Sequence, residues 1–202
     1  MHPAFSVWSY GRREDSGTDP EDRAEHPVTQ PAEIAPKTLP GLFIGDLDDV
    51  ADVGKLSALG IGFVLNLCPE RLTGRYADIP LQLAVANIKH LAWPADDDPN
   101  FNILGEVIHC GALEFVQNGF RVAGVLINCW GGVNRSGAVA VAYLALKSNY
   151  SLVCAVRQVM SQRGTVLTNK AFRLQLAEAV FAAGLPLQTP SHRLSLLSPL
   201  AG

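Results

Sequence analysis

The chain has 202 residues and a mass of 21.6 kDa, which is enough for one domain with a substantial core and for terminal tails. Hydrophobic residues make up 48% and charged residues 17% of the sequence, a balance that excludes a disordered or collagen-like chain. The net charge of −3 divides into −4 for residues 1–36 and +1 for the remainder, and no cluster of Lys and Arg marks a nucleic-acid-binding face.

Residues 1–36 mix Gly, Pro, Ser and charged residues without an apolar period, so we expect a flexible leader there. The opening residues lack a basic start followed by an apolar run, and His2 stands where N-myristoylation requires glycine. The apolar runs, such as residues 138–146, are shorter than the roughly 20 residues that a membrane-spanning helix needs. We therefore expect neither secretion nor a membrane span, and a cytoplasmic location.

Residues 37–185 alternate short strand-like runs with helical patterns, which predicts a single α/β domain. Strands are expected at residues 42–44, 63–67, 88–93 and 122–127, the last a β-branched run suited to a buried strand. Apolar residues three or four apart predict helices at residues 50–59, 103–116, 138–147, 152–162 and 171–183. Residues 186–202 are rich in proline and are expected to form a loose C-terminal tail.

The stretch VLINCWGGVNRSGAVA, which starts at Val125, places Cys129 at the end of a strand, Arg135 six residues later and a helix directly after. A loop of this length, wrapped so that its backbone N–H groups point inward, forms an anion site closed by the helix N-terminus. The same groups favour a thiolate, so Cys129 is the candidate nucleophile. Arg135 supplies a planar fork that matches two phosphoryl oxygens.

The loop residues themselves are the predicted phosphate-binding residues. Gly131 and Gly132 leave out side chains where the loop must turn sharply or its backbone must approach an anion. The full predicted set is Trp130, Gly131, Gly132, Val133, Asn134 and Arg135. No metal or cofactor is expected, because a thiolate and an arginine supply the chemistry.

The Cys-x5-Arg spacing alone is a weak signal, but among the four cysteines only Cys129 has it, and only Cys129 stands between a strand and a helix. The cysteines are too sparse for a disulfide scaffold, and no C-x-x-C pair suggests zinc. His109 and Cys110 form a second His-Cys pair, which the helical pattern of residues 103–116 assigns to a core helix. His90 is interpreted as a structural residue of a short strand rather than as a ligand.

The residues Cys129 to Ser136 resemble the Cys-x5-Arg-Ser signature of the cysteine-dependent protein phosphatases of the protein tyrosine phosphatase superfamily. Residues 38–185 resemble its dual-specificity branch, because a strand LFIG, a strand GIGFVLN, an acidic loop, the signature and the segment RGTVLTNKAFRLQL follow in that order. The late position of the cysteine argues against the low-molecular-weight phosphatases and arsenate reductases. The resemblance implies a small central, mostly parallel sheet flanked by helices.

Expulsion of an alkoxide or phenolate requires a proton donor, and a carboxylic acid on a loop can provide it. By the family pattern, Asp97 is the general acid, because it has the expected separation from Asn102, which opens a helix; Asp96 and Asp98 stay open as alternatives. The alternative is that the run DDDP is only a solvated turn. Ser136 resembles the hydroxyl that assists the departing thiolate, and it also suits an ordinary helix cap.

Two further positions carry hypotheses that rest on the resemblance. The family usually has histidine before the cysteine, and this chain has Asn128, which lacks a positive charge; reduced but not abolished activity is expected. The run NLCPER resembles a strand end in the tensin-homologue phosphatases, where the cysteine forms a disulfide with the nucleophile. Cys68 is therefore a candidate redox partner of Cys129, with buried packing as the alternative.

The resemblance implies a phosphoprotein substrate, because the signature loop lacks the lysines of the phosphoinositide-directed relatives. It also implies a shallow site that admits phosphotyrosine as well as phosphoserine and phosphothreonine. The competing interpretation is a weakly active or inactive phosphatase-like module that binds phosphorylated partners. Asn128 favours the module, whereas Cys129, Arg135 and the acidic loop favour the enzyme.

Overall fold

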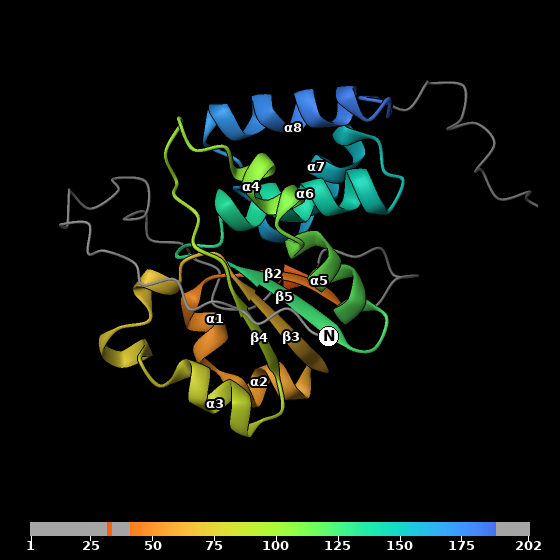
Figure 1. Cartoon of the computed structure of the whole chain (residues 1–202). Coiled ribbons are helices and arrows are strands. Elements are labelled where there is room, and N and C mark those ends of the chain that lie inside the picture. The colour runs from red at the N-terminus through yellow and green to blue at the C-terminus, as the bar shows by residue number, and fades with distance from the viewer. Residues whose placement is uncertain (1–31, 34–40, 189–202) are drawn as a thin grey trace, which may run out of the picture.

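The computed structural model describes residues 32–33 and 41–188, and a five-stranded sheet lies at its centre (Figure 1). The strand order is β1-β2-β5-β3-β4, in which β2, β5, β3 and β4 are parallel and β1 runs antiparallel to β2. The strands are β1 Ala32–Glu33, β2 Leu42–Gly45, β3 Ile61–Asn66, β4 Lys89–Ala92 and β5 Gly124–Asn128. The predicted fold class, a small and mostly parallel sheet flanked by helices, is confirmed.

Helices cover both faces of the sheet (Figure 1). Right-handed connections that run in opposite directions across a parallel sheet place their helices on opposite faces. One face carries α1 Leu47–Ala51, α2 Val53–Ala58 and α3 Ile79–Val85. The other carries α4 Ile103–His109, α5 Ala112–Phe120, α6 Arg135–Lys147, α7 Leu152–Arg163 and α8 Lys170–Ala182. Helix α6 lies against the sheet and is enclosed by α4, α7 and α8, so residues 135–145 are all buried.

Two predicted helices are each divided in two. The helix expected at residues 50–59 becomes α1 and α2, because Asp52 ends the first and caps the second by accepting a hydrogen bond from the Lys55 N–H. The helix expected at residues 103–116 becomes α4 and α5, because Gly111 adopts a positive φ of 85°. Helix α3 and two 3-10 turns, Pro69–Arg71 and Gly74–Tyr76, were not predicted.

The expected tails are described only in part. Strand β1 lies inside residues 1–36, for which the sequence predicts no element, and the rest of that segment lies outside the described residues, as do residues 189–202. At the other end, the carbonyls of Pro186 and Leu187 accept hydrogen bonds from the N–H groups of Leu152 and Val153. The start of the predicted tail therefore helps to cap α7.

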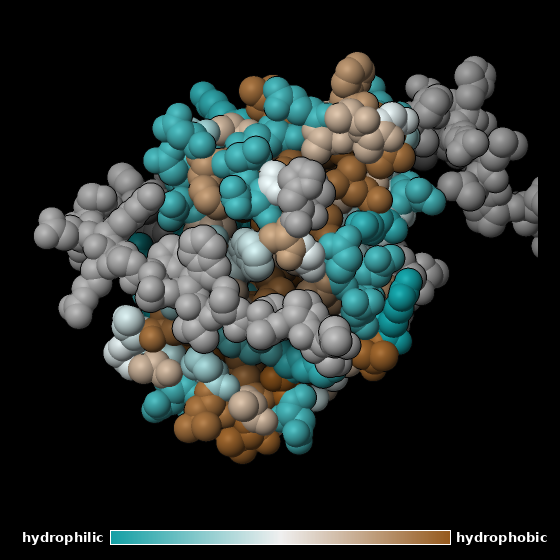
Figure 2. Space-filling view, viewed as in Figure 1, coloured by the Kyte–Doolittle hydropathy of each residue, from teal (hydrophilic) through white to brown (hydrophobic). Residues whose placement is uncertain are grey.

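Hydrophilic side chains cover much of the face shown in Figure 2, and an apolar patch lies at its lower end, over α3. Leu81 and Val85 on that helix are 66% and 76% exposed. None of the helices within residues 41–188 has the length and apolar content needed to cross a lipid bilayer.

Candidate functional site

The loop between β5 and α6 brings Cys129 and Arg135 together at the carboxyl edge of the parallel sheet, where open α/β folds bind ligands. Cys129 directly follows the last residue of β5, and Arg135 is the first residue of α6. Both are nearly enclosed, with exposed fractions of 2% and 3%. The Cys129 Sγ lies 3.2 Å from the Oγ of Ser136, in the first turn of α6.

The direction of the loop's peptide groups follows from hydrogen bonds made on its outer side. The Trp130 carbonyl accepts from the Leu47 N–H at 3.3 Å, and the Val133 carbonyl accepts from the Leu167 N–H at 3.2 Å. The Gly131 carbonyl accepts from Arg163 at 3.4 Å. Because C=O and the following N–H point in opposite directions in a trans peptide, the next N–H groups face the inside of the loop. An inward row of N–H groups at a helix N-terminus suits an anion.

Arg135 is held by groups from two neighbouring segments. Its Nη1 donates to the Ala95 carbonyl at 3.1 Å and lies 3.4 Å from Oε1 of Glu70, in the turn after β3. Burial raises the pKa of Glu70, and the positive charges of Arg135 and Arg71 oppose that rise. These contacts anchor one end of the guanidinium at Nη1. Sequence reasoning missed Glu70, although it lies in the run NLCPER that drew attention to Cys68.

Arg163, at the end of α7, supports the loop from outside. Its side chain is 2% exposed and pairs with Asp46 at 3.0 Å and with Asp49 at 3.4 Å. Desolvation is the main reason that the pKa of Asp49 is raised to about 6; the charge of Asp46 adds to the rise and that of Arg163 opposes it. A Cβ on Gly132, whose φ is 70°, would overlap the Arg163 guanidinium and lie 2.9 Å from the Gly45 backbone. Sequence reasoning did not identify Arg163 as a supporting residue.

The acidic loop shows three different environments for its aspartates. The half-buried Asp97 accepts a hydrogen bond from Nδ2 of Asn169 at 3.0 Å. Asp98 is exposed and closes a local turn, since its carboxylate accepts from the backbone and side-chain nitrogens of Asn100. Asp96 is exposed, and its charge raises the pKa of Glu70. Of the three, Asp97 is the one that a long-range hydrogen bond ties to the surroundings of the loop.

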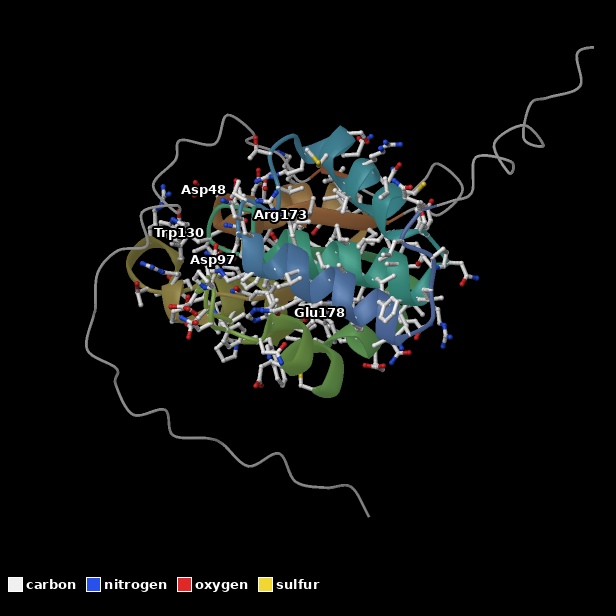
Figure 3. All side chains as sticks on the ribbon, turned by 90° about the horizontal axis from the view of Figure 1, so that it is seen from above. Asp48, Asp97, Trp130, Arg173 and Glu178 are labelled. Carbon is white, nitrogen blue, oxygen red and sulfur yellow. The ribbon has the colours of Figure 1, made fainter. Side chains whose placement is uncertain are left out.

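Trp130 packs among aromatic and charged side chains beside the loop. Its ring meets that of Tyr76 edge to face at 6.2 Å, and the Arg71 guanidinium lies 5.2 Å from the ring centre. The Tyr76 hydroxyl donates to Asp48 at 2.7 Å. Figure 3 shows Asp48, Trp130 and Asp97 at one end of the molecule, whereas Glu178 lies farther along α8.

Asn128 lies at the sheet edge just below the loop and is 0% exposed. It is paired in register with Asn66 of β3, and among the described residues neither Oδ1 nor Nδ2 of Asn128 has a hydrogen-bond partner. Leu67, next to Asn66, donates its N–H to the Asn128 carbonyl at 2.9 Å. Cys68 and Cys129 therefore each lie one residue beyond this hydrogen bond, at the ends of neighbouring strands. Both thiols are buried.

The two remaining histidine and cysteine candidates lie in other parts of the domain. His90 is on β4, where burial lowers its pKa and favours the neutral ring. Cys110 is at the C-terminal end of α4 rather than inside one continuous helix, and its thiol donates to the Val107 carbonyl. Burial raises the pKa of Cys110, which disfavours the thiolate.

The fold and the loop geometry define an α/β domain of the protein tyrosine phosphatase type, and comparison with known proteins narrows this class. The family model for the catalytic domain of dual specificity phosphatases matches residues 42–180, so the chain belongs to the dual-specificity phosphatase family. Dual specificity protein phosphatase 26 of Rattus norvegicus is 33% identical over 144 residues, which are 70% of this chain and 65% of that protein. The match thus spans less than two thirds of the relative.

Two crystal structures are similar across most of the domain. The mouse putative dual specificity phosphatase complexed with zinc tungstate has a TM-score of 0.63 and 26% identity, and the alignment covers 86% of this chain and 100% of that one. Human DUSP28 has a TM-score of 0.62 and 25% identity, with coverage of 78% and 97%. The family resemblance inferred from the sequence is therefore confirmed.

Proposed function

We propose that this chain is a protein phosphatase that hydrolyses phosphotyrosine and phosphoserine or phosphothreonine monoesters through a phospho-cysteine at Cys129. The observation that supports the proposal is the loop itself, which runs from the buried Cys129 at the end of β5 to the buried Arg135 at the start of α6 and has its carbonyls bonded on the outer side. Membership of the dual-specificity family supports it. We propose the cytoplasm as its location.

In the first step, the Cys129 thiolate attacks phosphorus while the bond from phosphorus to the ester oxygen breaks. Arg135 and the loop N–H groups stabilise the charge on the equatorial oxygens. Asp97 gives its proton to the leaving oxygen. The products are a phospho-cysteine, the dephosphorylated hydroxyl group and the Asp97 carboxylate.

In the second step, water attacks the phosphorus, its proton passes to Asp97, and the bond between sulfur and phosphorus breaks to release inorganic phosphate. The sulfur leaves as a thiolate. The Ser136 hydroxyl, 3.2 Å from Sγ, donates a hydrogen bond that stabilises this thiolate. Both residues of the cycle return to their starting protonation states.

Hydrolysis of phenyl phosphate and of a phosphotyrosine and a phosphothreonine peptide by purified variants tests the proposal. Wild type should be active and Cys129→Ser inactive, and Asp97→Ala should lose about 100-fold in kcat. Asp96→Ala and Asp98→Ala are the matched controls and should lose less than about threefold. Equal, near-zero rates for wild type, Cys129→Ser and Asp97→Ala would contradict an enzyme.

The second candidate function is a weakly active or inactive module that binds phosphorylated partners. The buried Asn128 favours it, because an amide supplies no positive charge beside the cysteine. Binding of the same phosphopeptides by Cys129→Ser, with no turnover by wild type, is the result expected of such a module.

A further inference from the structure

The segment between α7 and α8 is hydrogen-bonded to the phosphate-binding loop at several points. The Thr168 hydroxyl and the Asn169 N–H both donate to Oδ1 of Asn134, each at 3.0 Å. The Leu167 N–H donates to the Val133 carbonyl. Leu167 adopts a φ of 57°, a conformation that persists in a leucine only where surrounding contacts fix it. Residues 167–169 are therefore held in a set position relative to the loop.

The side chain of Asn169 uses both of its polar atoms, and it is 5% exposed. Oδ1 accepts a hydrogen bond from the Ala171 N–H at 3.0 Å and so caps α8, while Nδ2 donates to Oδ1 of Asp97 at 3.0 Å. Because the amide is planar, the cap determines which way the NH₂ group faces. A reversed amide would lose the cap and set two oxygens against each other.

We propose that Asn169 is the positioning residue of the general acid, an inference that rests on the proposed role of Asp97. A protonated carboxyl group has one oxygen that accepts and one that carries the proton. The carbonyl oxygen is the better acceptor of the two, so an N–H group bound to Oδ1 favours the state in which Oδ2 carries the proton. Asn169 thereby presents the acid in one orientation and links its position to the loop that binds the phosphoryl group.

A second contact fixes the other part of the acidic loop. Nη1 of Arg135 donates to the carbonyl of Ala95, two residues before Asp97. The acid is therefore held between the first residue of α6 and the N-cap of α8. Loss of the Asn169 donor releases the carboxyl group while the backbone anchor at Ala95 stays.

Asn169→Ser isolates the donor, because serine keeps the helix cap but is too short to reach Asp97. Two esters with different leaving groups separate proton donation from general damage. Phenyl phosphate needs protonation of its leaving oxygen, whereas 4-nitrophenyl phosphate has a much better leaving group. Because Asp97 also acts in the second step, which both esters share, the comparison uses kcat/KM, which reports the first step. We expect kcat/KM for phenyl phosphate to fall about 10- to 100-fold, with less than about a threefold change for 4-nitrophenyl phosphate. The inhibition constant of inorganic phosphate, which monitors the loop, should be unchanged.

Asn169→Asp provides a second readout, since aspartate also caps the helix but replaces the donor with a negative charge. Like charge favours the protonated acid, so the alkaline limb of kcat/KM for phenyl phosphate should move to higher pH. The double variant Asp97→Ala/Asn169→Ser should be no slower on phenyl phosphate than Asp97→Ala, because the two residues act as one unit.

The outcomes distinguish this inference from the proposed function. If Asn169→Ser lowers kcat/KM equally for both esters, or raises the phosphate inhibition constant in proportion, Asn169 acts only in the structure and the inference is wrong. If Asp97→Ala itself shows no selectivity between the esters, the inference fails with the assignment of the acid. If wild type hydrolyses neither ester, the proposed function fails first.

Discussion

The guanidinium of Arg163 and the carbonyl of Gly131 meet on the outer side of the loop between β5 and α6, with Nη2 3.4 Å from the oxygen. The same guanidinium pairs with Asp46 and Asp49, which flank the start of α1. One buried cation thus joins three segments: the start of α1, the loop and the end of α7. The inward direction of the loop's N–H groups depends on such outer contacts.

Arg163→Met should destabilise the domain by about 3 kcal/mol, because it leaves the buried Asp49 and the half-buried Asp46 carboxylates without their cation. It should also lower kcat/KM by at least about tenfold, since the Gly131 carbonyl loses its outer partner. Urea unfolding and turnover of 4-nitrophenyl phosphate measure the two effects. Arg157→Met, on the exposed side of the same helix, is the control and should change stability by less than about 0.5 kcal/mol. Equal losses in both variants would contradict a supporting role.

Gly132→Ala should cost more than a positive φ alone explains. Gly132 and Gly184 have φ values of 70° and 65°, but a Cβ on Gly184 would meet nothing within 4 Å. Gly184→Ala should therefore lose only the backbone term, about 1 kcal/mol. Gly132→Ala should lose a further 1–3 kcal/mol or so, because the methyl group overlaps Arg163 and the Gly45 backbone. The difference between the two unfolding free energies is the measurement, and a difference near zero contradicts the close approach.

Asp49 should make stability depend on pH. Its pKa rises from 3.8 to about 6 on folding, mainly through burial. A carboxyl group with a raised pKa contributes stability that is fully present below pH 4 and is lost as the pH rises through about 6. The unfolding free energy of wild type minus that of Asp49→Asn should therefore fall over this range by on the order of 2–3 kcal/mol, at about 1.4 kcal/mol per pKa unit. Urea titrations at pH 4, 5, 6 and 7 measure it, and a difference that rises with pH would reverse the sign.

Asn128→His should increase the thiolate fraction of Cys129, because a histidine in the position before the cysteine can carry a positive charge that the amide lacks. We expect alkylation by iodoacetamide at pH 6 to become about tenfold faster, the effect of one pKa unit. Turnover of a small aryl phosphate should rise as well. The same substitution in the Cys129→Ser background identifies the alkylated residue. Unchanged alkylation and turnover would show that Asn128 does not limit reactivity.

The loop that carries Cys129 and Arg135 could be predicted from the sequence, but the residues that support it could not. Cys129 and Arg135 could be recognised because their fixed spacing falls within eight consecutive residues. A buried strand precedes the cysteine, two glycines lie between the two residues, and a helix follows. Arg163, Glu70 and Asn169 reach the site only through the fold, and a single sequence carries no signal of which distant side chains meet. The helices predicted at residues 50–59 and 103–116 are each divided in two for a local reason. Asp52 and Gly111 interrupt these helices without removing the apolar period of the sequence.

Cys68 should protect Cys129 from irreversible oxidation. Both cysteines leave adjacent parallel strands one residue beyond the hydrogen bond between the Leu67 N–H and the Asn128 carbonyl, so their thiols belong to the same edge of the sheet. Peroxide converts the Cys129 thiolate to a sulfenic acid, and attack by the Cys68 thiol on that sulfur forms a disulfide and releases water.

After peroxide treatment, non-reducing mass mapping should find the Cys68–Cys129 pair, and a reductant should restore activity. In Cys68→Ser, Cys129 should instead be oxidised to sulfinic acid, and the activity should not return with the reductant. Cys154→Ser, at an exposed cysteine of α7, is the control and should behave as wild type. Sulfinic acid at Cys129 in the wild-type protein, without the disulfide, would leave Cys68 as a packing residue.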